Sequence, residues 1–573
     1  MADLNTSGQD TAVTDGIHTL TPGTLAAAAA AACVGSVALA IPAVLNGLFQ
    51  ADLGPTSSQL TWISDAFFVP ICLLELTFGV LGDLFGRKRL LVGGAVVLAL
   101  GEAVAVLTPG AASSTGTRVL VLWIGQIIAG IGAAALFPTS LAMIAAGTHT
   151  ARARARSITI WAAGLSAGGV VSPVLGGLVT KLTFGSDANA SWRWAFIAVV
   201  VLALVSAALS LWLARDSSAP QGRSLDWPGQ VTIAVALFAL LFAVIQGPTS
   251  GWGSAEVVVG FVIAAVFLVL FILAERRSAA PLLRLDFFAN RAFAVTAAVT
   301  VIGPFAFLGT AYATSIRLSV IEGFSPLKTS IAFVCFNGVT LLQVPLTARL
   351  IEKYNPKWLL GGGFLLIGVG DIWLAAVPAD SAPAPGVSLA PVIAPFILVG
   401  IGSALGISSL TAVAVNVMPN HLAGMASGTT NMLRDFGFTL GPAVIGAVAL
   451  SRAAATVQAQ LAGSATLRGA LAAFNAAPAH VPAAQRPAVE AAVGAVNSGP
   501  LGANAVPATL PGPGGKPVPF NPLKDVAFHA LSHAYSVGYI VCAVAALLAA
   551  AVAVAAVGGR ARETLLDPQT LTE

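Results

Sequence analysis

Fourteen apolar stretches follow one another along this sequence, and each is long enough to cross the hydrocarbon core of a lipid bilayer. A helix needs about 20 residues to span about 30 Å of hydrocarbon. In that medium the backbone amides must be bonded within the segment, so a long apolar stretch folds as a helix. We therefore expect an all-α polytopic membrane protein. The stretches cover residues 24–49, 58–82, 90–109, 119–146, 157–182, 194–214, 228–247, 255–274, 292–317, 328–350, 358–377, 389–414, 424–450 and 533–557.

Composition narrows the class of function. Charged residues make up 9% of the chain, whereas soluble proteins contain about 25%. The four cysteines lie within apolar stretches, so no disulfide framework is expected. The sequence contains no H-E-x-x-H, G-x-S-x-G or P-loop motif and no cluster of histidines, which argues against an enzyme or an ATP-driven pump. We expect no metal, no cofactor and no nucleic-acid partner.

Lysine and arginine are distributed unevenly among the short connections. With both termini placed inside, seventeen of these residues fall in inner connections and five in outer ones. Basic residues concentrate on the cytoplasmic side of membrane proteins. The chain is therefore predicted to be a multi-pass protein of the cell (inner) membrane with both termini in the cytoplasm.

One connection is much longer than the others, because residues 451–532 separate the last two stretches. Long loops cross the membrane regardless of their charge, so this Ala- and Pro-rich segment is expected outside. Residues 453–476 and 482–496 are predicted to be helical, and the Pro/Gly-rich residues 497–522 to be extended or disordered. A passive external spacer is one interpretation. A gating hairpin, or a docking site for an external partner, is the other.

The sequence GVLGDLFGRKR, residues 79–89, joins the second and third stretches and must reverse the chain at once. Its glycines allow close backbone approach, its acid supplies an acceptor, and its basic residues anchor the turn on the cytoplasmic side. This segment resembles the signature loop of the major facilitator superfamily, which implies a gating role. The positions that match the pattern include Gly79, Asp83, Gly86, Arg87 and Lys88.

A second set of matches resembles the fourteen-span drug:proton antiporter branch of that superfamily. The fifth stretch contains Gly168-x-x-x-Ser172-Pro173-x-x-Gly176-Gly177, which is similar to the antiporter motif except that Ser172 replaces a glycine. Small residues at this spacing let helices approach closely, and the proline bends the span. Further matches lie at residues 191–196, 225–229, 281–293 and 424–446.

The resemblance implies a major facilitator fold with six, two and six helices. Two residues depart from the pattern of the family: Cys33 stands where the first span usually has an acid, and Gln126 where the fourth usually has an arginine. The family is thought to use both missing groups in proton coupling, so coupling here would need other groups or be absent. The expected segments are a cytoplasmic tail at 1–23, a six-helix bundle at 24–216, two additional helices at 217–276, a second six-helix bundle at 277–557 that includes the external loop 451–532, and a cytoplasmic tail at 558–573.

Four acids, Asp65, Glu75, Glu102 and Asp371, lie within the predicted spans. A charge at this depth costs roughly 3 kcal/mol or more, and apolar surroundings favour the neutral carboxyl group, which suits reversible proton uptake. The functional interpretation is that one or two of these acids replace the missing pair. The structural interpretation is a protonated acid bonded to a neighbouring helix. At about 1.5 Å per residue, Asp65 and Glu102 lie at similar depth, and we expect them to face one cavity and share a proton.

Polar and aromatic side chains at depth are candidates for the lining of a substrate cavity. Arg434 and Asp435 are instead expected to form an ion-pair network at the inner end of the thirteenth span. The cavity candidates are Asn46, Phe67, Gln126, Trp161, Asn337 and Gln343.

The implied function is secondary active transport, in which hydrophobic compounds, cationic ones among them, are exported by proton antiport with alternating access. The alternative is an exporter of a specific lipid, peptide or metabolite, with unusual or no proton coupling. The expected partners are a small hydrophobic substrate, protons and the lipid bilayer.

Overall fold

The computed structural model describes residues 19–148, 150–185, 187, 189–218, 225–278, 281–379, 388–416, 423–483, 485–511 and 517–556. Over these residues, fourteen helices are long and apolar enough to cross a membrane, and they match the predicted spans in number and order. The expectation of an all-α polytopic membrane protein is thereby confirmed. Most of the two predicted terminal tails lies outside the described residues.

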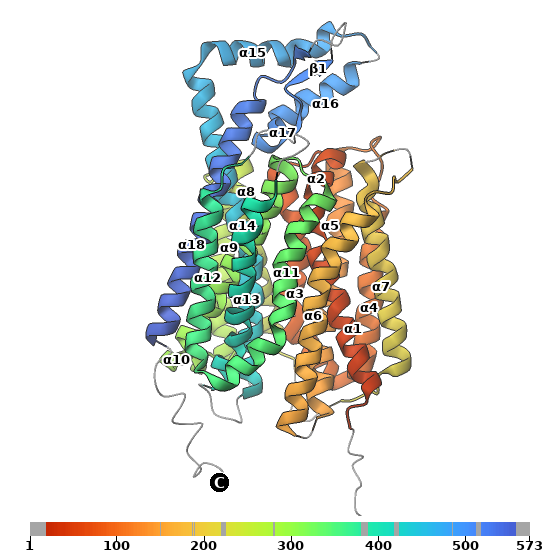
Figure 1. The fold of residues 1–573 in the computed structure, drawn as a ribbon, viewed down its shortest axis with the longest axis vertical. Helices are drawn as coiled ribbons and strands as arrows, with labels where there is room; N and C mark the ends of the chain where they lie inside the picture. Colours follow the sequence, from red (N-terminus) through yellow and green to blue (C-terminus); the bar gives the residue numbers. More distant parts are fainter. Residues whose placement is uncertain are drawn as a thin grey trace, which may run out of the picture.

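The N-terminal bundle is built from α1 to α7, and its first span consists of two helices (Figure 1). α1 ends at Ala40 and α2 begins at Pro42, because a proline has no N–H group to continue the helical ladder. α4 packs along α5 and α7, and α1 packs against α6. The helices of this bundle are α1 (Pro22–Ala40), α2 (Pro42–Leu53), α3 (Ser57–Phe85), α4 (Arg87–Val106), α5 (Thr115–Ala146), α6 (Ala151–Val179) and α7 (Trp192–Leu213), with the 3-10 turn η1 (Asn189–Ser191) before α7.

The two additional helices are α8 (Trp227–Ser250) and α9 (Ala255–Arg277). Asp226 begins α8 as its N-cap, since its Oδ1 accepts from the Gly229 amide at 3.0 Å. α8 packs against both α3 and α14, and α9 packs against α8. Val262 of α9 is 56% exposed, as expected for a helix whose outer face contacts lipid. The pair therefore covers one seam between the two bundles.

The C-terminal bundle begins with α10, which continues through a π-helical turn, and ends with α18. α10 packs against α14 and α18, and α12 packs against α13 and α18. Its elements are η2 (Leu285–Ala289), α10 (Arg291–Ile316), η3 (Arg317–Ile321), α11 (Pro326–Lys353), α12 (Pro356–Ala376), α13 (Ala390–Asn416), α14 (Ala423–Gly463) and α18 (Lys524–Ala556).

Residues 464–523, which we call the cap, form a small folded unit above one end of the bundles (Figure 1). The predicted helices are present. The prediction that residues 497–522 are extended or disordered is wrong for residues 500–505, which form a helix, whereas residues 509–511 and 517–519 are extended as strands. Leu501 is 1% exposed, and the Asn521 amide donates to the carbonyls of Ala503 and Val506, so side-chain burial and backbone capping order the segment. The cap elements are α15 (Ala465–Ala476), η5 (Ala477–His480), α16 (Arg486–Asn497), α17 (Pro500–Ala505) and the antiparallel strands β1 (Thr509–Pro511) and β2 (Pro517–Pro519).

We call the two ends of the molecule the cap end and the loop end. The cap end includes α2, η3 and the cap, with α17 in contact with both α2 and η3. The loop end carries the turn between α3 and α4, where α3 ends at Phe85 and α4 begins at Arg87. A single Gly86 connects them, so the predicted abrupt reversal of the chain is confirmed.

Candidate functional site: a cavity between the bundles

A cavity of about 1970 Å³ lies between the two bundles. Residues of α1, α2, α3, α5 and α6 line it on one side, and residues of α10, α11 and α14 on the other. Its volume exceeds the 300–1,000 Å³ typical of drug-sized pockets. Of the cavity candidates from the sequence, Asn46, Trp161 and Asn337 line it, and Trp161 Nε1 donates to Ser140 Oγ at 2.9 Å.

The other three cavity candidates, Phe67, Gln126 and Gln343, do not line the cavity, so this part of the prediction is wrong. Phe67 is 1% exposed and its backbone packs against Gly130 inside the N-terminal bundle. Gln126 is fully buried and donates to a neighbouring helix rather than facing the centre. On α3 the side chain that reaches the cavity is the next one, Phe68.

At its cap end the cavity is closed by contact between α2 and the end of α10. Asn46 Nδ2 donates to Ser315 Oγ at 2.8 Å, and the Ser315 hydroxyl donates to the Ala43 carbonyl. Gly47 permits this approach, because a Cβ at that position would lie 2.5 Å from the carbonyl oxygen of Ser319. Residues of both bundles therefore form a shut gate at the cap end.

Charged residues line the cavity toward the loop end, among them Asp83, Arg87 and Arg154. Arg154 is exposed, whereas the side chains of Asp83 and Arg87 are 8% and 9% exposed. Arg276 and Asp286, which line the same end, are exposed like Arg154. Since the cap end is shut and the loop end is lined by these exposed charges, the cavity opens toward the loop end.

The signature loop is held by its own charges and by the segment that follows α7. Asp83 Oδ1 accepts from Arg87 Nε at 3.0 Å and from Nη2 at 2.6 Å. The Arg87 amide donates to the Ser217 carbonyl, and the Lys88 amide donates to Asp216 Oδ1 at 3.0 Å. Asp83 therefore acts as a hydrogen-bond acceptor, and its donor is Arg87, the first residue of α4.

Two glycines of the signature loop have distinct roles. Gly86 has φ +100°, which L side chains rarely adopt, and a Cβ there would lie 2.8 Å from Asp216 Oδ2. Gly79 lines the cavity, and a Cβ at that position would lie 3.8 Å from Pro138, an ordinary contact. The backbone conformation therefore requires glycine at position 86 but not at position 79.

The antiporter-motif segment of α6 presents one set of small residues to the N-terminal bundle. A Cβ on Gly168 would overlap the Cys33 carbonyl, and one on Gly176 would lie 2.7 Å from Val44 Cγ2. Ser172 Oγ donates to the Val37 carbonyl at 3.0 Å, near the break between α1 and α2. Ser172, which replaces a glycine of the motif, thus donates a hydrogen bond to the backbone of the first span, which is divided into α1 and α2.

The same segment presents its other face to the C-terminal bundle. A Cβ on Gly177 would lie 2.5 Å from Ser330 Oγ of α11, and one on Gly169 would lie 3.1 Å from Asn337 Oδ1. Pro173, between them, lines the cavity. The motif therefore lies at a contact between the bundles that any relative movement must change.

The embedded acids fall into two groups. Asp65, Glu102 and Asp371 are fully buried and do not line the cavity. Glu102 Oε2 accepts from Gln126 Nε2 at 3.3 Å, and Asp371 Oδ1 accepts from a threonine of α10 at 2.7 Å. In the part of the chain that the structure describes, neither carboxylate oxygen of Asp65 has a hydrogen-bond partner. The expectation that Asp65 and Glu102 face one cavity is wrong, because Glu102 points to α5 and α3 turns other residues inward.

Glu75 is the embedded candidate acid that lines the cavity, and it lies opposite Arg434 and Asp435 of α14. The ion pair expected between these two residues is present, with Arg434 Nε 2.8 Å from Asp435 Oδ1, but its expected place at the helix end is wrong, because both residues line the cavity. α14 begins at Ala423, so Arg434 lies about 16 Å into the helix at 1.5 Å per residue. In the sequence, this depth is indicated by the position of Arg434 ten residues into the apolar stretch 424–450.

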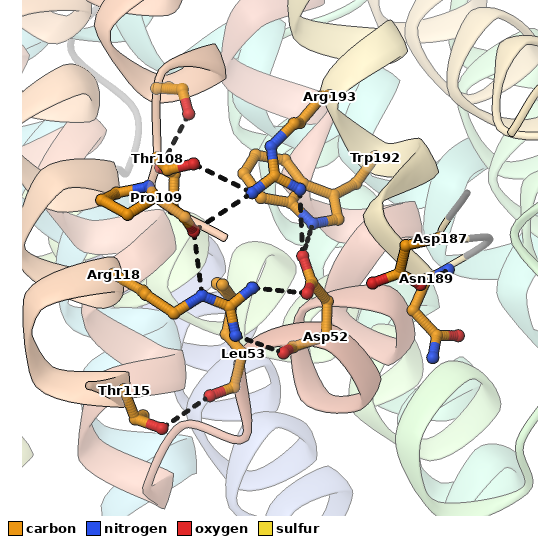
Figure 2. Close-up of polar contacts among 11 residues, drawn as sticks. Asp52, Leu53, Thr108, Pro109, Thr115, Arg118, Asp187, Asn189, Trp192 and Arg193 are labelled. Atoms are coloured by element: carbon orange, nitrogen blue, oxygen red, sulfur yellow. Dashed lines mark hydrogen bonds and ion pairs between the residues drawn. The ribbon is translucent and has the colours of Figure 1, made fainter. Parts of the chain in front are cut away.

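A buried charge cluster fixes the gate helix α2 to its own bundle (Figure 2). Asp52, at the end of α2, accepts from Arg118 Nη2 at 2.5 Å, from Arg193 Nη1 at 3.1 Å and from Trp192 Nε1 at 2.7 Å. The guanidinium groups also donate to carbonyls that follow α4: Arg193 to Thr108 and Arg118 to Pro109, both at 3.0 Å. Arg118 and Arg193, two of the five basic residues expected in outer connections, are thus buried and brace α2.

The C-terminal bundle has a corresponding brace on the opposing gate element. Arg317, the first residue of η3, donates to Glu322 Oε1 at 2.9 Å, to the carbonyl of Leu374 in the last turn of α12 and to the carbonyl of Pro378 just after that helix. In each bundle, therefore, a buried arginine joins the end of the first membrane span to the end of the third. In the N-terminal bundle these ends are those of α2 and α4, and in the C-terminal bundle those of η3 and α12. The two sides of the gate are each tied to their own bundle by these contacts.

Comparison with known proteins is consistent across sequence and structure. The family model described as Major Facilitator Superfamily matches residues 24–442. The multidrug resistance protein Stp of Mycobacterium tuberculosis is 31% identical over 404 residues, which cover 70% of this chain and 71% of that protein. The tetracenomycin C resistance and export protein of Streptomyces glaucescens is 27% identical over 416 residues, which cover 72% and 73%.

Solved structures share the fold. A bacterial homolog of the human lysosomal transporter Spinster, in an inward-facing and occupied conformation, superposes with a TM-score of 0.58 at 14% identity and covers 92% of this chain and 95% of its own. Transporters, not enzymes, make up these matches. From the family model, the relatives and the fold together, this chain is a membrane transporter of the major facilitator superfamily.

Proposed function

We propose that the protein exports hydrophobic compounds, organic cations among them, by proton antiport with alternating access. The observation that carries this proposal is the cavity of about 1970 Å³, shut at one end and bearing the carboxyl group of Glu75 in its wall. Its lining includes Phe68, Trp161, Phe336 and Phe438, which suit flat apolar substrates. The names of the relatives, multidrug resistance protein and tetracenomycin C resistance and export protein, support the substrate class.

Alternating access would follow from rocking of one bundle against the other. The cap-end gate between Asn46 and Ser315 would open while the loop end closes around the signature loop. Because Asp52 and Arg317 brace the two sides of the gate to their own bundles, each side would move as a unit. The basic residues at the loop end support a cytoplasmic location for that end, with the cap outside.

Proton coupling would use carboxyl groups in place of the positions occupied by Cys33 and Gln126. Among the four candidate acids Glu75 is the first choice, because the coupling carboxyl group must take up its proton from the cavity and release it into the cavity. Asp65, Glu102 and Asp371 are enclosed by helices in this conformation and would serve only if another conformation exposed them.

The cap would act at the gate rather than as a passive external spacer. Asn504 Nδ2 donates to the Val320 carbonyl at 3.0 Å, and so binds the end of the helix that forms the gate. The Lys524 ammonium donates to the Asn504 carbonyl, which ties the same residue to the start of α18. A separate external partner on the cap is compatible with this role.

Export is tested by the efflux of ethidium and of a neutral dye from cells that express the full chain, with and without a protonophore. We expect dye to leave faster than from cells with an empty vector, and the protonophore to abolish the difference. Efflux that persists with the protonophore would contradict proton antiport. Equal dye retention in both cell lines across a panel of hydrophobic compounds would contradict the proposed export.

A further inference from the structure

Two acidic side chains meet at the loop end, where the additional helices α8 and α9 join the segment that leads into the C-terminal bundle. Asp226 is the N-cap of α8, and Glu275 lies in the last turn of α9. Residues 281–284, which we call the linker, lead directly into η2 and so belong to the start of the C-terminal bundle.

The additional helices are hydrogen-bonded to the N-terminal bundle near both ends of α8. Gln230, in the first turn of α8, accepts from Thr77 Oγ1 at 2.5 Å and donates to the Leu73 carbonyl of α3. Toward the other end of α8, Ser58 Oγ of α3 donates to the Ile245 carbonyl at 2.7 Å. α8 therefore follows α3 when the two bundles move relative to each other.

The linker lies where this unit meets the C-terminal bundle. Leu283 is 7% exposed and packs in a buried apolar cluster whose other members come from α8, α9 and α14: Ile233, Phe271 and Met432. Any rocking of one bundle against the other must therefore shift the linker and α14 along α8 at this point.

The two acids fasten the linker to the ends of α8 and α9. Asp226 Oδ2 accepts from the Leu282 amide at 3.3 Å, and Glu275 Oε2 accepts from the Leu283 amide at 3.1 Å. Two consecutive backbone amides of the linker are thus bound by two carboxyl groups of the additional helices. We call this arrangement of Asp226, Glu275 and the two amides the clasp.

One oxygen of the clasp lacks a donor. Glu275 is 4% exposed, and its Oε1 has no hydrogen-bond donor in the part of the chain that the structure describes. A Cβ on Gly229 would lie 2.5 Å from this oxygen and 2.7 Å from Asp226 Oδ2, so the two interacting carboxyl groups lie against the same backbone position. Two ionised carboxylates in contact repel each other, and a buried acceptor without a donor is costly. One proton shared between the two acids supplies the missing donor.

The other charged groups near the clasp are occupied elsewhere or lie in solvent. Arg276 and Arg277 of α9 are exposed, and Arg434 of α14 is paired with Asp435. The remaining charged residues on the described elements that pack here are Glu75 and Asp83 of α3, Arg284 of the linker and Asp286 of η2. The charge state of the clasp is therefore set by its own two acids and by the water at the loop end.

We propose that Asp226 and Glu275 form a pH-sensitive clasp, which holds the linker while the two acids share one proton and releases it when that proton is lost. On opening, the two carboxyl groups separate, both ionise in water near neutral pH, and one proton passes to the water at the loop end. On closing, one proton is taken up again. With the loop end in the cytoplasm, the clasp is closed at acidic cytoplasmic pH and opens as the cytoplasm becomes alkaline.

Opening of the clasp removes a tie between the two bundles. Because α8 follows α3 and the linker belongs to the C-terminal bundle, the closed clasp holds the bundles in the relative position in which the loop end is open. An alkaline cytoplasm therefore frees the loop end to close. This regulation goes beyond the proposed export function, and the clasp itself can be tested without any transported compound.

The test is hydrogen–deuterium exchange of purified full-length protein in detergent, measured over a series of pH values on a peptide that contains the Leu282 and Leu283 amides. Each rate is divided by the intrinsic exchange rate at the same pH, which gives the open fraction of the clasp. Because opening releases one proton, this fraction should rise about tenfold per pH unit in wild type while the closed clasp holds its proton. An open fraction that does not change with pH would overturn the proposal.

Two isosteric variants replace the shared proton by a permanent donor. In Glu275→Gln the new amide group can donate to Asp226, and in Asp226→Asn it can donate to Glu275, while asparagine remains a good N-cap for α8. Opening then releases no proton, so the open fraction should change less than about twofold over the same pH range. Glu256→Gln, an exposed acid at the other end of α9, is the matched control and should keep the wild-type slope. A wild-type slope in either isosteric variant would show that another group titrates.

Transport gives a second readout, which a purely structural role of the clasp would not change with pH. In cells whose cytoplasmic pH is clamped, the ratio of ethidium efflux by wild type to efflux by Glu275→Gln should rise from mildly acidic to mildly alkaline pH, because only the wild-type clasp opens. The pH dependence of proton coupling is common to both proteins and cancels in the ratio. A constant ratio would overturn the regulatory role. If neither protein exports any dye, the proposed export function fails, whereas the exchange measurement still decides on the clasp.

Discussion

Asn46 of α2 donates a hydrogen bond of 2.8 Å to Ser315 of α10, and this bond joins the two bundles across the cap end of the cavity. The two residues are 269 positions apart in the chain. Because the cavity opens toward the opposite end, the proposed alternating access assigns this contact to one of its two states. It should therefore be absent whenever the cap end is open.

A cross-link at this contact should arrest transport. In a variant without the four native cysteines, Asn46→Cys and Ser315→Cys would be joined by a short bifunctional methanethiosulfonate. We expect cross-linked protein to bind ethidium but to stop efflux, with recovery after reduction, because the gate cannot open. Either single variant treated with the same reagent is the control. Efflux by fully cross-linked protein would show that this contact is not the gate.

Asp83→Asn should leave the abundance of the protein in the membrane unchanged and strongly reduce transport. The substitution keeps the shape of the side chain but removes the charge that pairs with Arg87 at 2.6 Å. A hydrogen bond to a charged group contributes about 1.5–3 kcal/mol, enough to shift the balance of two conformations. Dye efflux normalised to protein amount measures the effect. Asp286→Asn removes a carboxylate whose side chain is 83% exposed at the same end and should have little effect.

Gly86→Ala should destabilise the protein. The φ of +100° at Gly86 disfavours any side chain, and the new Cβ would lie 2.8 Å from Asp216 Oδ2. A strained backbone position costs of order 1–3 kcal/mol, which a lower melting temperature in detergent would report. Gly93→Ala on α4 meets nothing within 4 Å and should be neutral or slightly stabilising, since alanine favours the helix. Equal melting temperatures for the two variants would refute the argument from strain.

Asp52→Asn should be among the most damaging conservative changes. It leaves the guanidinium groups of Arg118 and Arg193, whose side chains are each 5% exposed, without their counter-ion (Figure 2). Removing one partner of a buried ion pair costs about 3–5 kcal/mol, so the folded yield and the melting temperature should fall. Asp187→Asn, an exposed acid nearby, is the matched control. A variant as stable as that control would mean that Asp52 does not brace α2.

Sidedness can be tested with single cysteines in the variant that lacks the native ones. Thr466→Cys lies on the exposed face of α15 in the cap, and Ser218→Cys is exposed beside the signature loop. The excess of lysine and arginine at the loop end predicts that an impermeant maleimide added to intact cells labels the first and misses the second. Permeabilised cells should show labelling of both. The reverse pattern in intact cells would invert the assigned orientation.

The faces of the helices show where prediction from the sequence stops. Phe67 and Phe68 are adjacent and equally apolar, yet the first packs inside the N-terminal bundle and the second lines the cavity. Successive residues on a helix are about 100° apart, so a rotation of α3 by about that angle would exchange their roles. The interior of a membrane bundle and its surface are both apolar, so hydrophobicity does not reveal the rotation.

The order of the fourteen spans and the turn at Gly86 followed from the sequence alone, because hydropathy over about 20 residues and the conformational freedom of glycine are local properties. The cavity, the gate and the position of Glu75 opposite Arg434 and Asp435 were decided by tertiary structure. These features join α2 to α10 and α3 to α14, segments that are far apart in the chain. Their contact depends on how two bundles pack, and no local pattern of residues encodes that packing.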